Sequence, residues 1–207
     1  MNELTREDRL QYLLDSTEIF DLVRNERFCR DMLDWPGLLG SFVPGSPVRT
    51  TWFDGSIEEF VEASRAKMAK GSTAKHWIFP TKLRLNGDRG TIESPATIFA
   101  RQQLDGIEFD YFQFCRFFSR LMKTDGGWRL ASFEGIYQRD RMDVVNPADK
   151  PPVDWDLVKT LRPSYRFLAY NQMRQGYTVN PELIGDDRPD LLEEFYQQED
   201  RWLETGG

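Results

Sequence analysis

The sequence predicts an α+β protein, in which a strongly curved antiparallel sheet forms a cone-shaped half-barrel and helices enclose a pocket. Helical patterns dominate the chain before residue 72, and four long runs rich in aromatic and β-branched residues follow. Asn-Gly and Asp-Gly pairs, which are strong hairpin signals, separate these runs. Hydrophobic residues make up 40% of the 207 residues, enough for a substantial core. Helices on one face of such a sheet would enclose a ligand-sized cavity.

A long helix is expected over the first 35 residues. Thr5 can cap it, with Asp8 three positions later as a loose capping box. Pro36-Gly37 ends the pattern. The apolar positions that recur at roughly helical intervals are Leu10, Leu13, Leu14, Ile19, Leu22, Val23, Phe28 and Met32.

Three shorter elements are expected before the sheet. Residues 38–43 form a short helix, and residues 46–55 form a strand that ends in a turn. Residues 56–71 carry complete helix signals, with Ser56 as the cap, acidic residues in the first turn, and a closing glycine.

The four strand-like runs span residues 73–85, 90–104, 107–123 and 128–140. The turns between them are Asn86-Gly87, Asp105-Gly106 and Asp125-Gly126-Gly127. Four strands joined by three hairpins make an antiparallel meander, and strands of this length should curl strongly.

A Pro-rich segment over residues 146–155 marks a boundary. It divides the chain into an α+β domain, residues 1–148, and a helical extension, residues 149–207. The extension carries helical patterns over residues 155–162, 164–176 and 187–204, and the last is amphipathic. The amphipathic face could pack on its own domain, form a lid over a pocket, or contact a neighbouring subunit. Its apolar positions are Leu191, Leu192, Phe195, Tyr196, Trp202 and Leu203.

The composition restricts the partners. The net charge is −7 and no basic block is present, which argues against nucleic acid and an anionic membrane surface. The charged start has no apolar signal-peptide core, and no apolar run approaches the ~20 residues that cross a bilayer. We therefore expect a cytoplasmic protein. Cys29 and Cys115 have no metal-like spacing and are expected as reduced, buried thiols, with a disulfide or a catalytic cysteine as alternatives.

His76 is the only histidine. On a strand, His76 and Ile78 would face one side, and Trp77 and Phe79 the other. Because both sides carry apolar groups, we expect this strand to be covered on both faces. A buried imidazole needs a hydrogen-bond partner, and Asp31, expected on the helix face of Phe28 and Trp35, is the best candidate.

An Asp31–His76 pair in an apolar cavity is a usable general base. The carboxylate would orient the imidazole, select its tautomer, and stabilise the imidazolium formed when the base takes a proton. One histidine without a carboxylate cluster makes a poor metal site, so neither a metal nor another cofactor is expected. No Gly-x-Ser-x-Gly nucleophile motif is present. From the residues alone, a lone histidine on a strand is more often a satisfied core or surface residue than a catalytic base.

The sequence resembles SnoaL-like proteins of the nuclear-transport-factor-2-like superfamily over roughly residues 10–148. EIFDLVRNERFCRDMLDWPGLLGSF is similar to the opening helix of the family. KHWIFPTKLRLNGDRGTIES resembles its histidine-bearing strand, and FCRFFSRLMKTDGGWRLASFEGIYQRDR resembles its last hairpin. The residues that carry the opening match are Ile19, Asp21, Leu22, Asp31, Asp34 and Trp35.

The resemblance implies a chemistry. Scytalone dehydratase, bile acid 7α-dehydratases and a hexachlorocyclohexane dehydrochlorinase take a proton beside a leaving group on a small cyclic substrate. Asp31 and His76 match their aspartate and histidine. The implied function is a cofactor-independent lyase or isomerase acting on a small apolar, cyclic metabolite. The alternative is a non-catalytic hydrophobic-ligand-binding or accessory protein with the same fold. Relatives also suggest a homodimer or homotrimer.

Two positions depart from the family pattern. Glu26 stands where the dehydratases carry a tyrosine, and Phe133 and Glu134 stand where relatives carry an arginine. Glu26 could be a second acid or base, or a helix-surface carboxylate. Arg116 could replace the missing arginine, or form a surface ion pair. Arg27 could pair with Asp31 and compete with the dyad.

Several further side chains are candidates for the pocket wall or the core. We expect Asp140 to make a structural ion pair with a neighbouring arginine. The aromatic candidates for substrate binding, each of which could instead be ordinary core, are Trp35, Trp77, Phe112 and Phe114.

Overall fold

The computed structural model describes residues 5–69, 71 and 74–206. The helices are α1 (Arg6–Met32), α2 (Trp35–Gly40), α3 (Ile57–Ala69), α4 (Trp155–Thr160), α5 (Arg166–Arg174) and α6 (Pro189–Thr205). The strands are β1 (Pro47–Arg49), β2 (Asp54–Ser56), β3 (Lys75–Ile78), β4 (Lys82–Asn86), β5 (Arg89–Leu104), β6 (Ile107–Thr124), β7 (Gly127–Leu130) and β8 (Phe133–Val144).

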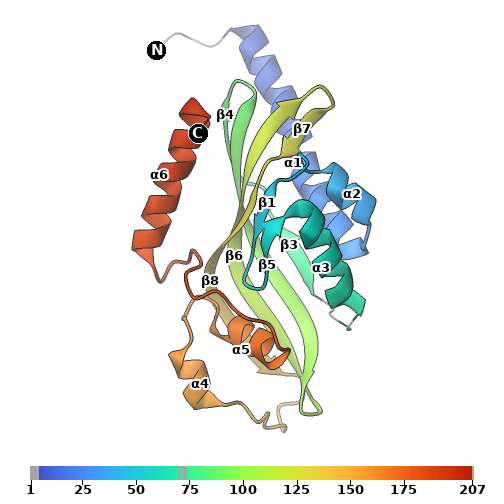
Figure 1. The fold of residues 1–207 in the computed structure, drawn as a ribbon, viewed down its shortest axis with the longest axis vertical. Helices are drawn as coiled ribbons and strands as arrows, with labels where there is room; N and C mark the ends of the chain where they lie inside the picture. Colours follow the sequence, from blue (N-terminus) through green and yellow to red (C-terminus); the bar gives the residue numbers. More distant parts are fainter. Residues whose placement is uncertain (1–4, 70, 72–73, 207) are drawn as a thin grey trace.

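The α+β class is confirmed, with helices first, then an eight-stranded sheet, then the C-terminal helices (Figure 1). The strand order is β2-β1-β8-β6-β5-β3, while β4 also pairs with β5 and β7 with β6. The prediction of a purely antiparallel sheet is wrong, because β1 lies parallel to β8. The strands of the described residues do not close into a barrel, since β2 and β3 are edges.

The predicted meander contains more strands than expected. The run over residues 73–85, whose first residue lies outside the described part, divides at Pro80 into β3 and β4. Proline has no N–H for the ladder, and both halves still pair with β5. The last run divides into β7 and β8, which both pair with β6. All three hairpins are confirmed, and Gly87, Gly106 and Gly127 have the positive φ that these turns need.

The short N-terminal elements differ in detail from the prediction. The capping box of Thr5 and Asp8 is present. The second helix begins at Trp35 rather than at residue 38, because the Asp34 side chain accepts the Gly37 N–H and caps it. The strand expected over residues 46–55 is a small antiparallel pair, β1 and β2.

The apolar stripe predicted for α1 is only partly correct. Ile19 and Val23 are buried, but Phe28 and Met32 are more than 60% exposed. The first turns of α1 extend beyond the sheet (Figure 1), so the leucines there, Leu10, Leu13 and Leu14, are exposed too. The buried face of the helix continues instead through the charged residues Glu26, Arg27 and Arg30.

The strand that carries His76 is covered on one face only. Trp77 and Phe79 are 58% and 60% exposed, so the expectation of cover on both faces is wrong. The reason is that β3 is an edge strand and α1 packs only on its His76 side.

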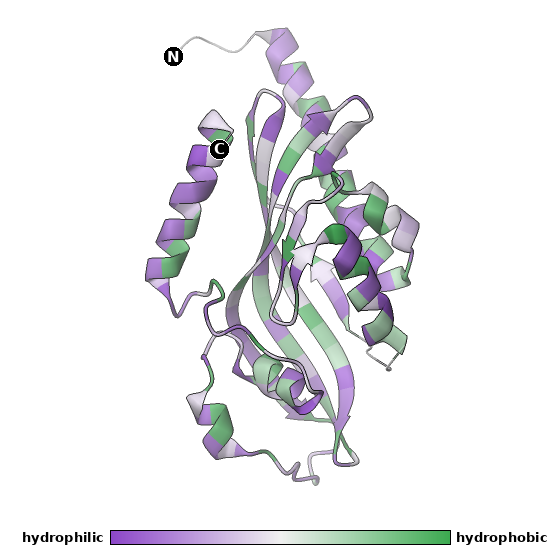
Figure 2. Cartoon of the chain, viewed as in Figure 1, coloured by the Kyte–Doolittle hydropathy of each residue, from purple (hydrophilic) through white to green (hydrophobic). Residues whose placement is uncertain are grey.

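The two long strands β5 and β6 place alternate residues on opposite faces, and hydrophobic and hydrophilic segments alternate along them (Figure 2). On β6, the residues buried beside the helices α1 and α5 have odd numbers, from Phe109 to Phe117. The even-numbered side includes Phe118, which α6 covers through Phe195 with ring centroids 5.0 Å apart.

The C-terminal extension packs on both faces of this sheet. On the α6 side, Arg120 donates to Glu199 at 2.8 Å and 3.0 Å. On the α5 side, the N–H of Leu168 donates to Asp140 at 2.7 Å. Asp140 thus binds a helix N-terminus, and no arginine among the described residues forms the ion pair expected for it. The domain boundary at residue 148 stays a prediction.

Candidate functional site

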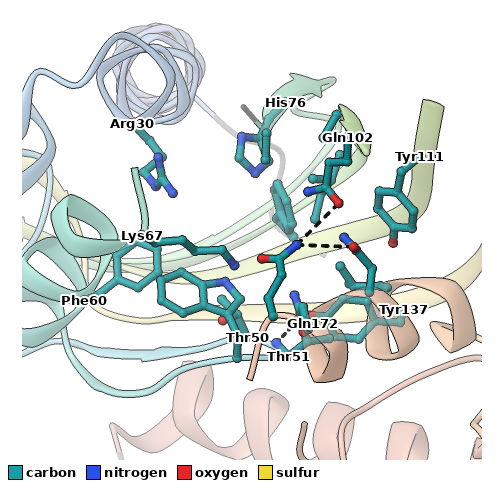
Figure 3. A pocket seen from close by; sticks show the side chains of 18 of the residues that line it. Arg30, Thr50, Thr51, Phe60, Lys67, His76, Gln102, Tyr111, Tyr137 and Gln172 are labelled. Carbon is teal, nitrogen blue, oxygen red and sulfur yellow. Dashed lines mark hydrogen bonds between the residues drawn. The ribbon is translucent and has the colours of Figure 1, made fainter. Parts of the chain in front are cut away.

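A cavity of about 80 Å³ lies between the sheet and the helices α1, α3 and α5 (Figure 3). Its lining side chains come from α1 (Arg27, Arg30), the β1–β2 turn (Thr50, Thr51, Trp52), α3 (Phe60, Lys67), the sheet (His76, Ile98, Ala100, Gln102, Tyr111, Phe117, Phe133, Tyr137) and α5 (Leu168, Asn171, Gln172, Gln175), with Ala74 beside β3. The extension therefore supplies one wall of the cavity.

His76 projects from β3 into this cavity (Figure 3). It is held there by Asp31 of α1. Its Nδ1 lies 2.7 Å from one Asp31 carboxylate oxygen, and its backbone N–H donates to the other oxygen at 2.7 Å. Both side chains are largely buried, with 9% and 13% of their surface exposed. One residue thus occupies both carboxylate oxygens, which fixes the position of the imidazole ring.

The pKa shifts of the pair define its protonation state. Burial opposes ionisation of Asp31, but hydrogen bonds from the His76 ring and backbone outweigh burial and lower its pKa. Burial lowers the pKa of His76 to about 4, and the nearby Arg27 and Arg30 act in the same direction, against the Asp31 hydrogen bond. At neutral pH the pair is therefore a carboxylate and a neutral imidazole. Since Nδ1 must donate to the carboxylate, Nε2 carries the free lone pair.

Two arginines of α1 lie beside the dyad. Arg27 is buried and forms a two-point ion pair with its neighbour Glu26, so it does not pair with Asp31. Its guanidinium also lies over the Phe133 ring, 4.5 Å from the centroid. Arg30 is 4% exposed, and burial lowers its pKa to about 10.

The α3 side of the cavity holds Lys67. Its Nζ lies 4.0 Å from the ring centroid of Trp52 and 4.8 Å from that of Tyr177. Burial lowers the pKa of this lysine to about 7, and the charge of Arg30 adds to the effect. Lys67 therefore gains or loses its proton far more readily near neutral pH than an exposed lysine does.

An outer groove adjoins the cavity. Four side chains line both spaces and form the rim between them: Lys67, Gln102, Asn171 and Gln175. The Gln175 amide donates to Asn171 at 3.2 Å and to Gln102 at 3.4 Å. These long, solvent-exposed bonds join α5 to β5 at the opening.

Comparison with known proteins identifies the family. A family model described as a SnoaL-like domain matches residues 11–134. The chain belongs to the SnoaL-like family. Pea pathogenicity protein 2 from Fusarium vanettenii is 32% identical over 202 residues, which cover 92% of this chain and 86% of that protein.

Solved structures share the SnoaL-like fold at low sequence identity. A hexachlorocyclohexane dehydrochlorinase, LinA type 2, is 14% identical with a TM-score of 0.54, and the match covers 70% of this chain and 98% of that one. A candidate scytalone dehydratase from Novosphingobium aromaticivorans is 15% identical with a TM-score of 0.50, covering 68% and 95%. These likenesses show the fold.

The sheet alternation separates three predicted binding residues from the SnoaL-like cavity. Phe112, Phe114 and Arg116 have even numbers on β6 and lie on the face away from His76. Arg116 donates to Glu93 at 2.7 Å and to Asp186 at 3.0 Å, which is the ion-pair alternative rather than a replacement for the missing family arginine.

The other predicted binding residues also lie outside the lining. Trp77 is exposed and stacks on Phe99, with centroids 4.8 Å apart. Trp35 packs behind the cavity, where the Arg30 guanidinium lies 5.7 Å from its ring centroid. Glu26 is 1% exposed and bound to Arg27, so the expectation of a helix-surface carboxylate is wrong.

Cys29 and Cys115 are free and buried, as expected. Among the residues that the structure describes, no group of three or more His, Cys, Asp and Glu side chains could hold a metal ion. No helix in the same residues is long and apolar enough to cross a membrane.

Proposed function

We propose that this protein is a cofactor-independent lyase or isomerase that acts on a small, mostly apolar, cyclic metabolite. His76 is the base, and Asp31 orients it. The observation that carries the proposal is the two-point contact of Asp31 with the ring and backbone of His76, because it leaves Nε2 unprotonated in an enclosed cavity. The fold shared with a dehydrochlorinase is consistent with this chemistry.

The proposed step is an elimination. His76 Nε2 takes a proton from a carbon of the substrate, and the electrons of that C–H bond form a new C=C bond. The bond from the neighbouring carbon to its hydroxyl oxygen breaks, and this oxygen takes the proton from the imidazolium and leaves as water. Asp31 stabilises the transient imidazolium. An isomerase would return the same proton to another carbon.

The lowered pKa of His76 bears on both halves of this step. The imidazole is neutral at pH 7, so the base form is present without deprotonation. The imidazolium is a stronger acid than a solvent-exposed one, so transfer of its proton to a poor leaving group is assisted. A base with a low pKa removes a proton from carbon less readily. The C–H bond of the substrate must therefore be acidified by a neighbouring electron-withdrawing group.

The test is a panel of small cyclic β-hydroxy ketones and β-hydroxy acids, incubated with the protein in D₂O and followed by NMR. We expect water loss, or deuterium incorporation beside the carbonyl, with at least one member. His76→Gln and Asp31→Asn should each reduce the rate about 100-fold or more, since general bases contribute 10²–10⁴-fold. Trp77→Phe, exposed on the other face of β3, is the matched control. Equal rates for wild type and His76→Gln would refute the proposal.

A second candidate function is binding of a hydrophobic ligand without catalysis. The observation that favours it is the pKa of His76, which at about 4 makes a weak base. The Tyr and Arg of related dehydratases are also replaced here, by Glu26 and by Phe133 and Glu134. This function expects ligand affinity to survive in His76→Gln, with no panel member turned over by the wild type.

A further inference from the structure

We propose that the ligand of this cavity is a small organic acid whose carboxylate binds between Arg30 of α1 and Lys67 of α3. The proposal concerns binding, and it rests on the proposed function only where it makes this acid the substrate of His76. It assigns a role to two cations that the dyad does not use.

Some cations that line the cavity have no carboxylate partner in the described part of the chain. Two carboxylates of α1 lie beside it: Glu26, which pairs with Arg27, and Asp31, whose two oxygens are both bound by His76. Arg30 and Lys67 remain, and the salt bridges of the described residues include neither of them. Among the described residues, Arg30 and Lys67 therefore face the cavity without a carboxylate at ion-pair distance, although the chain has a net charge of −7.

Arg30 carries an unused donor. Only 4% of the residue's surface is exposed, and its Nη1 has no hydrogen-bond partner among the described residues. Buried donors are rarely left unpaired, and a buried guanidinium strongly favours a carboxylate. Figure 3 shows the side chain directed from α1 toward the space that His76 and Lys67 also face.

Arg30 and Lys67 flank one aromatic surface. The Arg30 guanidinium lies 5.9 Å from the Phe60 centroid, and the Lys67 ammonium lies 4.0 Å from the Trp52 centroid. The Trp52 and Phe60 centroids are 5.6 Å apart. Cation–π contacts stabilise such cations without neutralising them. Two cations beside an aromatic pair suit a carboxylate attached to a flat or cyclic apolar body.

The position of the two cations also suits the dyad. Arg30 and His76 line the same cavity, and the charge of Arg30 acts on the pKa of His76, so a carboxylate held by Arg30 lies near the base. The remaining body of the acid would extend along Phe117 and Ile98 toward His76 Nε2. The cavity volume of about 80 Å³ is several times the ~10–15 Å³ needed to hold one water, and this size limits the ligand to a small ring or short chain.

Calorimetric titration with benzoate and with its neutral analogue benzamide tests the proposal. We expect benzoate to bind wild type at least tenfold more tightly than benzamide. Lys67→Met and Arg30→Gln should each weaken benzoate at least tenfold and leave benzamide unchanged. The matched controls are Lys159→Met and Arg24→Gln, which remove exposed, ion-paired cations of α4 and α1. The proposal fails if wild type binds neither probe, binds both equally, or keeps its benzoate affinity in Lys67→Met.

Thermal unfolding separates ligand binding from a structural role. Lys67→Met removes a partly buried charge that no carboxylate neutralises, so its Tm should equal or exceed that of wild type. A structural lysine would give a lower Tm. If Arg30→Gln does not fold, Lys67→Met decides the question alone.

The pH dependence of benzoate binding is a further readout. Affinity should fall as pH rises through about 7, where Lys67 loses its proton, and this fall should be absent in Lys67→Met. The charge that acts most directly on Lys67 is that of Arg30. Other charged side chains near Lys67 line the outer groove: Arg101, Asp105 and Arg174. These are paired, Arg101 with Asp110 and Arg174 with Asp105. A flat profile in wild type would count against the assignment of Lys67.

The two proposals can fail separately. If His76→Gln binds benzoate as wild type does but no acid is turned over, the anion site stands and the enzymatic function falls. If neutral substrates are turned over and Lys67→Met changes neither kcat nor KM, the function stands and the anion site falls. A rise in KM with unchanged kcat would show that the cations bind the ground-state carboxylate rather than a transient oxyanion.

Discussion

The proton on His76 Nδ1 is the feature on which the proposed chemistry depends. In wild type, we expect the single imidazole to titrate near pH 4 and to be protonated at Nδ1 when neutral, because Asp31 accepts from that atom. In Asp31→Asn the stabilising carboxylate is gone, so the pKa should fall further. The Asn amide can donate to Nδ1 and move the proton to Nε2. Imidazole ¹⁵N and ¹H shifts recorded against pH report both quantities.

An ordinary titration near pH 6.5 in both proteins would contradict this geometry, since it would mean a solvated imidazole away from Asp31. The control is Asp21→Asn, which removes an exposed carboxylate of the same helix that pairs with Arg24. This variant should leave the His76 titration unchanged.

The sequence paired Asp31 with His76 from family resemblance and from the need of a buried imidazole for a partner. It did not indicate Arg30 or Lys67, because charged residues in helices are normally assigned to the surface. A signal was nevertheless present. Arg30 continues the buried spacing of Ile19 and Val23 on α1, and Lys67 continues that of Phe60 and Ser64 on α3. A cation at the next position of a buried stripe is a candidate for a cavity.

The misplaced binding residues on β6 have a simple cause. Successive side chains of a strand face opposite sides, so an error of one position moves a whole set to the wrong face. The sequence-based prediction names Phe112, Phe114 and Arg116, whereas Tyr111 and Phe117 line the cavity. Aromatic residues occupy both sets, so the sequence alone did not distinguish the faces.

At the scale of elements, Gln113 connects β6 to the extension. It is fully buried, and its amide donates to the carbonyls of Phe114, Arg139 and Ser164 at 2.8–3.1 Å. Gln113→Leu should lower the free energy of unfolding by about 1–3 kcal/mol, because it leaves buried carbonyls without a donor. Urea unfolding measures the change. Gln197→Leu, on the exposed side of α6, is the control, and equal stability of the two variants would refute the role of Gln113.

We expect the hydrogen bonds between α5 and β5 at the opening of the cavity to control how fast a ligand enters and leaves. Gln175 bridges Gln102 and Asn171 where the cavity meets the outer groove, so Gln175→Ala should widen this opening. We expect the association and dissociation rates of benzoate to rise together, by severalfold, while Kd stays nearly constant. Stopped-flow tryptophan fluorescence can measure both rates. A change in Kd alone would show that Gln175 contacts the ligand instead.

The local elements were more predictable than the contacts between them. Caps and hairpin turns depend on a few adjacent residues, so Thr5, Asn86-Gly87 and Asp105-Gly106 were identified correctly. The parallel pairing of β1 with β8 joins Val48 to Phe133, far apart in sequence, and no local signal encodes it. The same holds for α5, whose place on the cavity wall depends on packing over the whole extension.

At the scale of the whole molecule, buried titratable groups oppose one another in their effect on stability. Burial raises the pKa of Glu134 to about 8 and that of Asp140 to about 7. Each of these carboxyl groups contributes fully to the free energy of unfolding below its ordinary pKa. This contribution is lost as pH rises through the raised pKa of the folded protein. His76 and Lys67 have lowered pKa values, so their contributions grow with pH instead. A single pH profile of the wild type therefore mixes opposite slopes.

The difference in stability between a variant and wild type, measured at several pH values, isolates the slope that a single group contributes. For Lys67, the unfolded chain binds more protons than the folded one between about pH 7 and its ordinary pKa of 10.5, so wild-type stability from this group rises over that window. Lys67→Met has no such group. Its advantage in free energy of unfolding over wild type should therefore be largest at pH 7 or below and shrink by pH 10, as urea unfolding at both values would show.

The same reasoning applies to His76 at acid pH. The free energy of unfolding of His76→Gln, relative to that of wild type, should rise as pH falls from 6.5 to 4, because the folded wild type resists protonation of this imidazole over that range. A difference that stays constant with pH would mean that the group has its ordinary pKa in the folded protein, and that the cavity is open to water around it.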